Sequence, residues 1–218
     1  MSHSYYSRLF EDRDHTEWHG GHDEYGFWCF RVEHPAWLVE FERLQSELQA
    51  ELLDGYQRFP HITLATVGLM DEQRWTIVDQ QIAQINASNV CPVNAGFGCL
   101  DSFDHSPMIS VLDNEGGLEA IRRVLHAVSR GDDPDAFTPH LTLGYYSRVV
   151  LIDSVLRPLQ ARCVEGCTLK QLLFCTFDTR SIKGPISVKR TVKLASEAAD
   201  ASRWPQSNAS RGSLPKEA

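Results

Sequence analysis

A five-residue phrase occurs twice in this chain of 218 residues, as PHITL at 60–64 and as PHLTL at 139–143. Each copy holds Pro, His, Thr and Leu in the same order, with His and Thr two positions apart. Successive side chains of a β-strand point to opposite faces, so His and Thr of one copy share a face. The repeat therefore predicts two related strands, each of which buries its aliphatic residues and presents a His–Thr pair on the other face.

Strict alternation fixes the remaining positions of both predicted strands. It places Ile62, Leu64 and Thr66 opposite the first His–Thr pair, and Leu141, Leu143 and Tyr145 opposite the second. The residues predicted to lie on the His–Thr faces are His61, Thr63, Ala65 and Val67 in the first copy, and His140, Thr142, Gly144 and Tyr146 in the second.

The two phrases sit in an alternating order of elements. Aromatic and β-branched runs bounded by turn residues predict strands at 26–33, 60–68, 91–103, 107–113, 139–146, 167–178 and 185–194. Apolar residues at helical spacing predict helices at 35–53, 71–86, 116–130 and 152–163, with Pro158 a break in the last. The mixture predicts an α+β fold with two lobes, in which two antiparallel sheets flank a central cleft and helices pack outside.

The ends of the chain differ in composition from its middle. Residues 1–25 are acidic and rich in histidine, and we interpret them as a mobile arm. Residues 26–194 form the predicted two-lobed domain. Residues 195–218 are small, polar and without periodicity, which predicts a disordered tail.

Bulk composition limits the classes of partner. The formal net charge of −8 argues against a protein that grips long duplex nucleic acid, which requires clustered Lys and Arg. No apolar run reaches the roughly 20 residues that span a bilayer, and the N-terminus lacks a signal-peptide pattern. We therefore expect a cytoplasmic, monomeric protein whose six cysteines stay reduced.

Paired histidines and threonines suit chemistry at phosphorus. Imidazole titrates near pH ~6.5, so one ring can accept a proton from an attacking oxygen while another donates one to a leaving oxygen. Each such transfer contributes on the order of 10²–10⁴-fold. Two neighbouring hydroxyls can donate hydrogen bonds to the non-bridging oxygens of a phosphate held between the rings, and no metal is obligatory.

The paired PHITL and PHLTL resemble the HxTx signatures of the two-histidine (2H) phosphoesterase superfamily, which includes 2′-5′ RNA ligase-like proteins and cyclic nucleotide phosphodiesterases. The resemblance implies that His61 and His140 form the acid–base pair, and that Thr63 and Thr142 bind the phosphate. The resemblance also implies that the reaction needs no cofactor. The implied substrates are 2′,3′-cyclic phosphates, 2′-5′ linkages, cyclic nucleotides or RNA ends.

Several points stay open at this level. Tyr146 is the candidate platform for a nucleobase, because alternation places it on the face of His140, and Arg148, just beyond it, is a candidate phosphate contact. The residues do not distinguish acid from base within the histidine pair, nor hydrolysis from ligation.

Two other classes of function remain. The same fold with lost catalysis is a nucleotide-binding or protein-binding module. Alternatively, the two strand histidines and the arm histidines, His15, His19 and His22, belong to a metal-dependent hydrolase.

Overall fold

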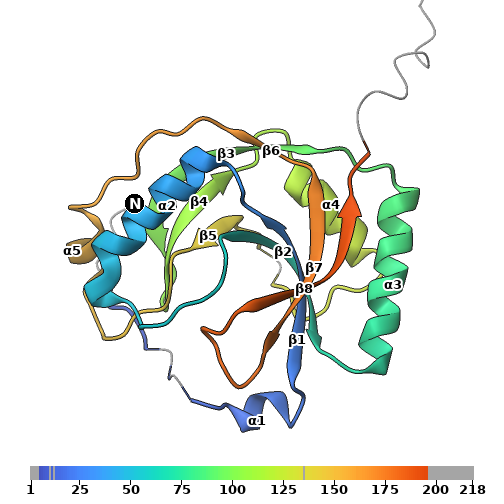
Figure 1. Ribbon diagram of the computed structural model, residues 1–218, viewed down its shortest axis with the longest axis horizontal. Coiled ribbons are helices and arrows are strands. Elements are labelled where there is room, and N and C mark those ends of the chain that lie inside the picture. Colours follow the sequence, from blue (N-terminus) through green and yellow to red (C-terminus); the bar gives the residue numbers. More distant parts are fainter. Residues whose placement is uncertain (1–4, 10, 12, 135, 196–218) are drawn as a thin grey trace, which may run out of the picture.

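The computed structural model describes residues 5–9, 11, 13–134 and 136–195, and it contains two antiparallel four-stranded sheets (Figure 1). The first sheet contains, in spatial order, β2 (His61–Leu69), β1 (Glu24–Arg31), β7 (Gln171–Asp178) and β8 (Ile186–Lys193). The second contains β5 (His140–Thr142), β4 (Pro107–Leu112), β3 (Val93–Ser102) and β6 (Cys167–Leu169). The predicted α+β class with two antiparallel sheets is confirmed.

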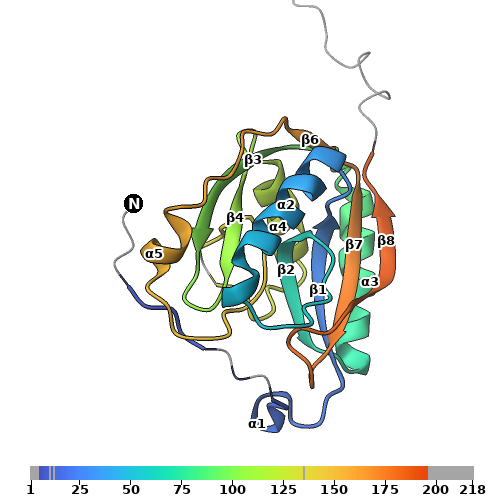
Figure 2. The same cartoon turned by 60° about the vertical axis from the view of Figure 1, so that its left-hand side comes forward.

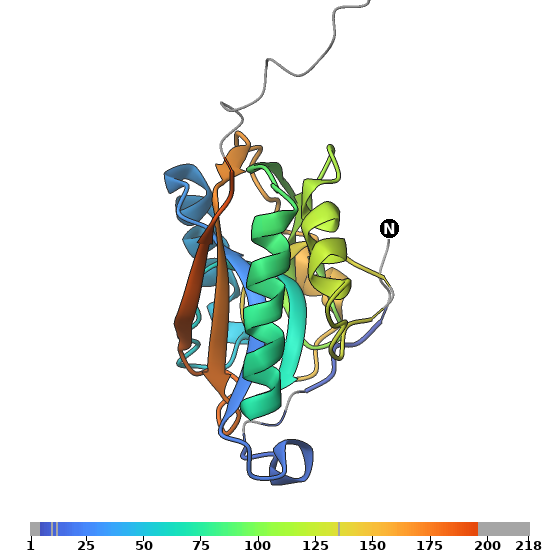
Figure 3. The ribbon, with the colours of Figure 1, turned by 90° about the vertical axis from the view of Figure 1, so that its right-hand side faces the viewer.

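Helices pack outside these sheets. They are α1 (Thr16–His19), α2 (Pro35–Leu48) with the short 3-10 turn η1 (Gln49–Glu51), α3 (Glu72–Ala87), α4 (Gly117–His126) and α5 (Ile152–Leu156). Proline opens α2, where its missing N–H costs nothing. Asp71 caps α3 by accepting a hydrogen bond from the backbone N–H of Arg74 at 2.7 Å. Figure 3 shows α3, in green, running in about the same direction as the strands of the first sheet and next to β2.

One hydrophobic core joins the helices to the same side of both sheets. Ile62 and Leu64 of β2 are 0% and 2% exposed, and Leu141 of β5 is 0% exposed. Trp28 and Phe174 of the first sheet belong to the same cluster. Each such side chain contributes about 1.5–3 kcal/mol on burial. The aliphatic positions of both phrases therefore lie in the core, as predicted, and they turn the His–Thr pairs to the opposite side.

The opposite face of the first sheet carries a second, smaller apolar cluster. It contains Phe27, Cys29, Leu173, Cys175 and Ile186, with Phe59 and Phe177 packed against it. Cys29 pairs directly with Thr63 across β1 and β2, so this cluster forms the floor beside the first His–Thr pair. We call the side of the sheet that holds this cluster the site face.

The two strands that carry the phrases lie next to each other. Strand β2 is the edge of the first sheet and β5 is the edge of the second, and the two are in contact. They lie near the centre of the molecule in Figure 1, and Figure 2 shows β2, β1, β7 and β8 side by side in that order. The fold thus brings the strands that begin with His61 and His140 into contact from separate sheets.

The alternation predicted for the first strand holds only for its first four residues. The β1–β2 register shifts between Trp28/Cys29 and again between Gly26/Phe27, so β2 carries two bulges. A bulge inserts an extra residue and changes the face of those that follow. Ala65 and Val67, predicted on the His–Thr face, instead join the main core.

Two other predicted elements are shorter in the structure. The helix predicted at 152–163 ends at Leu156, two residues before Pro158, because proline disfavours the helical conformation of the residue before it. The strand predicted at 139–146 contains only His140–Thr142. Gly144 lies at φ 153°, outside the range of an ordinary strand residue, and the chain turns away there.

The ends of the chain show specific contacts. Tyr6 forms an isolated bridge with Leu151, and Ser7 donates its backbone N–H to the carbonyl of Val150 at 2.8 Å. Predicted arm mobility stays a prediction, and β1 begins at Glu24, inside the range predicted for the arm. Of the predicted tail, 195–218, only Ala195 lies within the described residues.

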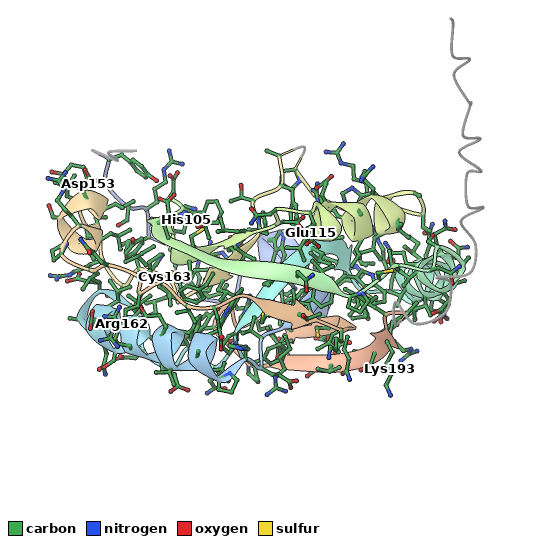
Figure 4. The ribbon with its side chains drawn as sticks, turned by 90° about the horizontal axis from the view of Figure 1, so that it is seen from above. His105, Glu115, Asp153, Arg162, Cys163 and Lys193 are labelled. Carbon is green, nitrogen blue, oxygen red and sulfur yellow. The ribbon has the colours of Figure 1, made fainter. Side chains whose placement is uncertain are left out.

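Viewed from above, the molecule has Asp153 of α5 on one side and Lys193 at the end of β8 on the other (Figure 4).

No helix in the described part of the chain is long and apolar enough to cross a membrane.

Candidate active site

The two phrase histidines have mirrored environments. Nδ1 of His61 lies 2.8 Å from the carbonyl oxygen of Phe59, and Nδ1 of His140 lies 2.7 Å from that of Thr138. In both cases the carbonyl belongs to the residue two positions earlier. A carbonyl oxygen can only accept a hydrogen bond, so Nδ1 carries the hydrogen in each ring. Nε2 is then the basic atom of each neutral imidazole, and within the described residues neither Nε2 has a hydrogen-bond partner.

The prolines of the two phrases also have equivalent roles. The carbonyl of Pro60 accepts a hydrogen bond from the backbone N–H of Val32, and that of Pro139 accepts one from Val111, both at 2.9 Å. Each bond ties the entry of a phrase strand to the neighbouring strand or its end. Corresponding residues of the two PHxTL copies thus have the same structural role. Pro fixes the start of the strand, His and Thr face the site, and the aliphatic residues pack in the core.

Thr63 and Thr142 are half-buried and lie two residues beyond each imidazole. Thr63 pairs with Cys29 on β1, and Thr142 pairs with Met108 on β4. Among the described residues, neither threonine hydroxyl has a hydrogen-bond partner. Both hydroxyls are available to donate to an anion at the same side of the sheets.

Burial strongly favours the neutral form of the first histidine. His61 is 9% exposed, and this burial lowers its pKa to about 4, with smaller contributions from the charges of Arg58 and His140. The carbonyl of Phe59 opposes the shift by holding the ring hydrogen.

Burial lowers the pKa of His140 as well, and the carbonyl of Thr138 again acts in the opposite direction. The ring of Phe103 packs edge-on against His140 with the ring centroids 4.8 Å apart. Phe59 packs edge-on against His61 with the ring centroids 5.8 Å apart, and Phe27 packs against it at a tilt with the centroids 5.6 Å apart. Aromatic rings therefore hold both imidazoles in place and exclude water from part of their surface.

Arg58 supplies the positive charge of this site. Its guanidinium lies over the ring of Phe177, 4.2 Å from the centroid, and 6.0 Å from the ring centroid of Tyr145. Its buried Nε has no hydrogen-bond partner, and no described carboxylate forms an ion pair with it. A cation close to His61, with a buried Nε that has no partner among the described residues, is suited to an anionic ligand.

Arg58 was not among the predicted site residues: it stands three residues before His61, whereas the predicted phosphate contact, Arg148, follows the second phrase. The available signal was the local sequence YQRF at 56–59, in which an arginine stands between aromatic residues at the entry to a phrase strand.

The loop before the second phrase is fixed to the strand of the first. The side chain of Asp133, 6% exposed, accepts hydrogen bonds from the backbone N–H and Oγ1 of Thr66 at 3.0 and 2.9 Å. Arg122 donates to the carbonyl of Leu64 at 3.1 Å and to that of Pro134 at 2.8 Å. Gly131, at φ 60°, lies so close that a Cβ there would collide with the carbonyl of Thr66. These contacts set the position of β5 relative to β2.

Tyr146 does not lie on the face predicted for it. Strand β5 ends at Thr142, and the backbone N–H of Tyr146 donates to the carbonyl of His105. The Tyr146 side chain is 0% exposed, packs with Val150, and has its hydroxyl 2.9 Å from Oγ of Ser102. The ring therefore has no exposed face on which a base could stack.

Arg148, the other tentative substrate residue, pairs with Glu51. Its Nε and a terminal nitrogen donate to the two carboxylate oxygens, both at 2.6 Å. The Arg148 side chain is 64% exposed. Its guanidinium is thus already engaged by a carboxylate, unlike that of Arg58.

The arm histidines have separate partners. Nε2 of His19 lies 2.6 Å from Oδ1 of Asp14, and Nδ1 of His22 lies 3.1 Å from the carbonyl of Met70. Nε2 of His15 lies 2.9 Å from the carbonyl of Glu11. Within the described ranges, no group of three or more His, Cys, Asp or Glu side chains is arranged to hold a metal ion.

The chain matches a known protein family over most of its length. The family model described as the 2′-5′ RNA ligase superfamily matches residues 33–174, a range that includes both phrases. No curated protein matches the chain.

Solved structures share this fold. TT0787 of Thermus thermophilus superposes with a TM-score of 0.54 at 12% identity, covering 79% of this chain and 99% of that one. E. coli LigT complexed with NADP+ gives a TM-score of 0.56 at 12% identity, covering 80% and 99%. E. coli LigT complexed with 3′-AMP gives 0.55 at 12% identity, covering 79% and 99%.

Proposed function

The chain belongs to the 2′-5′ RNA ligase superfamily, and on that basis we propose that it is a metal-independent phosphodiesterase acting on a phosphodiester of a nucleotide or RNA end. The proposed substrates are 2′,3′-cyclic phosphates, 2′-5′ linkages and cyclic nucleotides. The observation that carries the proposal is the mirrored pair of imidazoles, in which both Nδ1 atoms are held by backbone carbonyls and, within the described residues, both Nε2 atoms are free. The complexes of E. coli LigT with phosphate, ATP and 3′-AMP support ligands of this class.

The hydrolytic step uses both rings. Nε2 of His61 accepts a proton from water as the water oxygen forms a bond to phosphorus. The bond from phosphorus to one ribose oxygen breaks, and Nε2–H of His140 donates its proton to that oxygen. The hydroxyls of Thr63 and Thr142 and the guanidinium of Arg58 donate to the non-bridging oxygens, whose charge rises in the transition state.

We assign His61 as the base and His140 as the acid because the positive charge of Arg58 lies close to His61. Arg58 is close enough to His61 to disfavour its protonated form, whereas no arginine acts in this way on His140 among the described residues. His140 is therefore the ring that more readily carries the donated proton. An anionic substrate raises the pKa of both rings and allows one of them to be protonated at neutral pH.

The test is a panel of 2′,3′-cyclic mononucleotides, 2′-5′ dinucleotides and cyclic dinucleotides assayed with EDTA present. We expect turnover of at least one class, and a loss on the order of 10²–10⁴-fold in kcat for His61→Asn and for His140→Asn. His15→Asn, a change of the same type in the arm, serves as the matched control and keeps full activity.

The alternative results are distinct. Full activity in both histidine variants would sink the proposed mechanism. Binding of 3′-AMP without turnover of any substrate, unchanged by either substitution, identifies a binding module. Activity abolished by EDTA and restored by a divalent ion identifies a metal-dependent hydrolase.

We further propose that the protein acts as a monomer in the cytoplasm. All six cysteines are free thiols, the state that a reducing compartment maintains. Sedimentation at micromolar concentration tests the oligomeric state.

A further inference from the structure

A cavity of about 530 Å³ lies beside the candidate active site. It is bounded by the end of β1, the start of α2, strand β6 and the starts of β7 and β8. Its lining includes Arg31, His34, Lys170, Gln171 and Leu173. This volume is in the range of cavities that hold nucleotide-sized molecules.

The cavity is on the site face of the first sheet. Arg31 pairs directly with His61 across β1 and β2, so their side chains project from the same side. Leu173 pairs with Cys29, which in turn pairs with Thr63. The cavity therefore begins one strand away from the His–Thr pair, a spacing of about 5 Å.

Arg31 links the cavity to His61 through one aromatic ring. Its guanidinium lies 4.9 Å from the ring centroid of Phe59, and that ring packs against His61 at 5.8 Å. A molecule bound at the two imidazoles can thus extend along the site face of the sheet, past Phe59, into the cavity.

The lining has the chemistry of a nucleotide site. Two cations, Arg31 and Lys170, line it, and Lys170 has no ion-pair partner among the described residues. Glu33 lies 3.7 Å from Arg31 but is 78% exposed, so it neutralises Arg31 only weakly. Leu173 and Val188 provide an apolar wall.

The cavity lining also contains a buried nitrogen atom that has no hydrogen-bond partner among the described residues. Nδ1 of His34, which lines the cavity, is buried and has no hydrogen-bond partner in the described part of the chain. His34 precedes the first residue of α2, yet its side chain does not cap that helix. Buried polar atoms without a partner are uncommon in folded proteins, and a ligand in the cavity can provide one.

We infer that this cavity binds the nucleotide adjacent to the scissile linkage, with Arg31 and Lys170 contacting its phosphate. The inference rests on the proposed function and narrows it: the preferred substrate is a short single-stranded oligonucleotide end rather than a mononucleotide. The net charge of −8 does not oppose this, because binding of one short end depends on local rather than overall charge.

The experiment compares two substrates in one assay, adenosine 2′,3′-cyclic phosphate and the dinucleotide ApA that ends in a 2′,3′-cyclic phosphate. We expect kcat/KM to be about tenfold higher for the dinucleotide. Lys170→Gln and Arg31→Gln each reduce this preference about fivefold by raising KM for the dinucleotide, and Lys170→Gln leaves the mononucleotide unchanged.

Arg190→Gln is the matched control. Arg190 is on β8 of the same sheet but pairs with Phe174 and lies over Trp75, on the side opposite the cavity. This variant should keep the full preference. Equal kcat/KM for the two substrates in the unmodified protein, or equal loss on both in Lys170→Gln, would overturn the inference and leave the proposed function intact.

A binding measurement separates the two proposals if neither substrate is turned over. The titrants are 3′-AMP and ApA with a 3′-phosphate. Tighter binding of the dinucleotide that is lost in Lys170→Gln supports the cavity site although the proposed catalytic function has failed. Equal affinities in the unmodified protein rule the cavity site out.

Discussion

Asp133 accepts two hydrogen bonds from Thr66, one from its backbone N–H at 3.0 Å and one from its Oγ1 at 2.9 Å. Asp133 stands in the loop that leads into the second phrase, and Thr66 stands on the strand of the first. The same carboxylate lies 2.7 Å from Nε2 of His126 and 4.0 Å from Arg122. One buried carboxylate therefore holds the two halves of the candidate active site in register.

Replacing this carboxylate should reduce both stability and activity. In Asp133→Ala, Arg122 loses its buried ion-pair partner while remaining buried itself, and we expect a loss of about 3–5 kcal/mol in the free energy of unfolding. Thr66→Val removes one hydrogen bond and keeps the backbone bond, so it should cost about 1 kcal/mol. Urea unfolding measures both, and similar losses in the two variants contradict this account.

Arg58 should matter to rate and to the titration of its neighbour. We expect Arg58→Gln to lower kcat/KM about tenfold to a hundredfold, because a charged donor to the phosphate is lost. The pKa of His61 should rise in the same variant, since the arginine charge is one cause of its low value. NMR titration of the imidazole protons measures the shift.

Arg58→Lys keeps the charge but not the planar group that lies over Phe177. It should restore the low pKa of His61 and only part of the rate. A variant series in which activity falls but the pKa of His61 does not move contradicts the assigned position of Arg58.

Stability should depend on pH through His61. Its pKa is about 4 in the folded protein, while an unfolded histidine titrates near ~6.5. As the pH falls, the unfolded chain therefore binds the proton first. The contribution of neutral, buried His61 to the free energy of unfolding is complete above pH ~6.5 and is lost as the pH falls toward 4. The difference between the pKa values of His61 in the folded and unfolded states corresponds to about 3 kcal/mol in the free energy of unfolding.

The change His61→Gln removes the titrating group. Denaturant unfolding at neutral and acid pH should show a smaller decrease in stability for this variant than for the unmodified protein. Parallel pH profiles in the two proteins contradict the burial assigned to His61.

Tyr146 should act through the fold rather than through the substrate. Tyr146→Phe removes the hydrogen bond to Ser102 and should lower the free energy of unfolding by about 1 kcal/mol. KM for a nucleotide substrate should not change, because the ring is buried. A rise in KM without a change in stability would show that this tyrosine contacts the substrate.

The phrase repeat predicted the parts of the site that depend on local sequence. Alternation over His61–Leu64 needs only that the strand be regular at its start, and the aliphatic positions of both phrases lie in the core as expected.

The sequence did not predict the features that depend on distant partners. The bulges in β2 arise from its pairing with β1, so the positions of Ala65 and Val67 could not follow from alternation alone. Tyr146 was misplaced because β5 stops at Thr142, and its ring then packs with Val150 and Ile152. Arg58 reaches its position through Phe177, a residue far away in the chain.

The tethering of each imidazole to a carbonyl of its own chain has a consequence for reversibility. A half-turn of either ring would break that contact, so the same nitrogen stays outermost whether or not the ring is charged. Donor and acceptor can then exchange tasks by exchanging protons with solvent, as microscopic reversibility requires. For the proposed reaction, cleavage and joining of the phosphodiester thus use the same protein geometry, and the equilibrium constant together with the reactant concentrations sets the net direction.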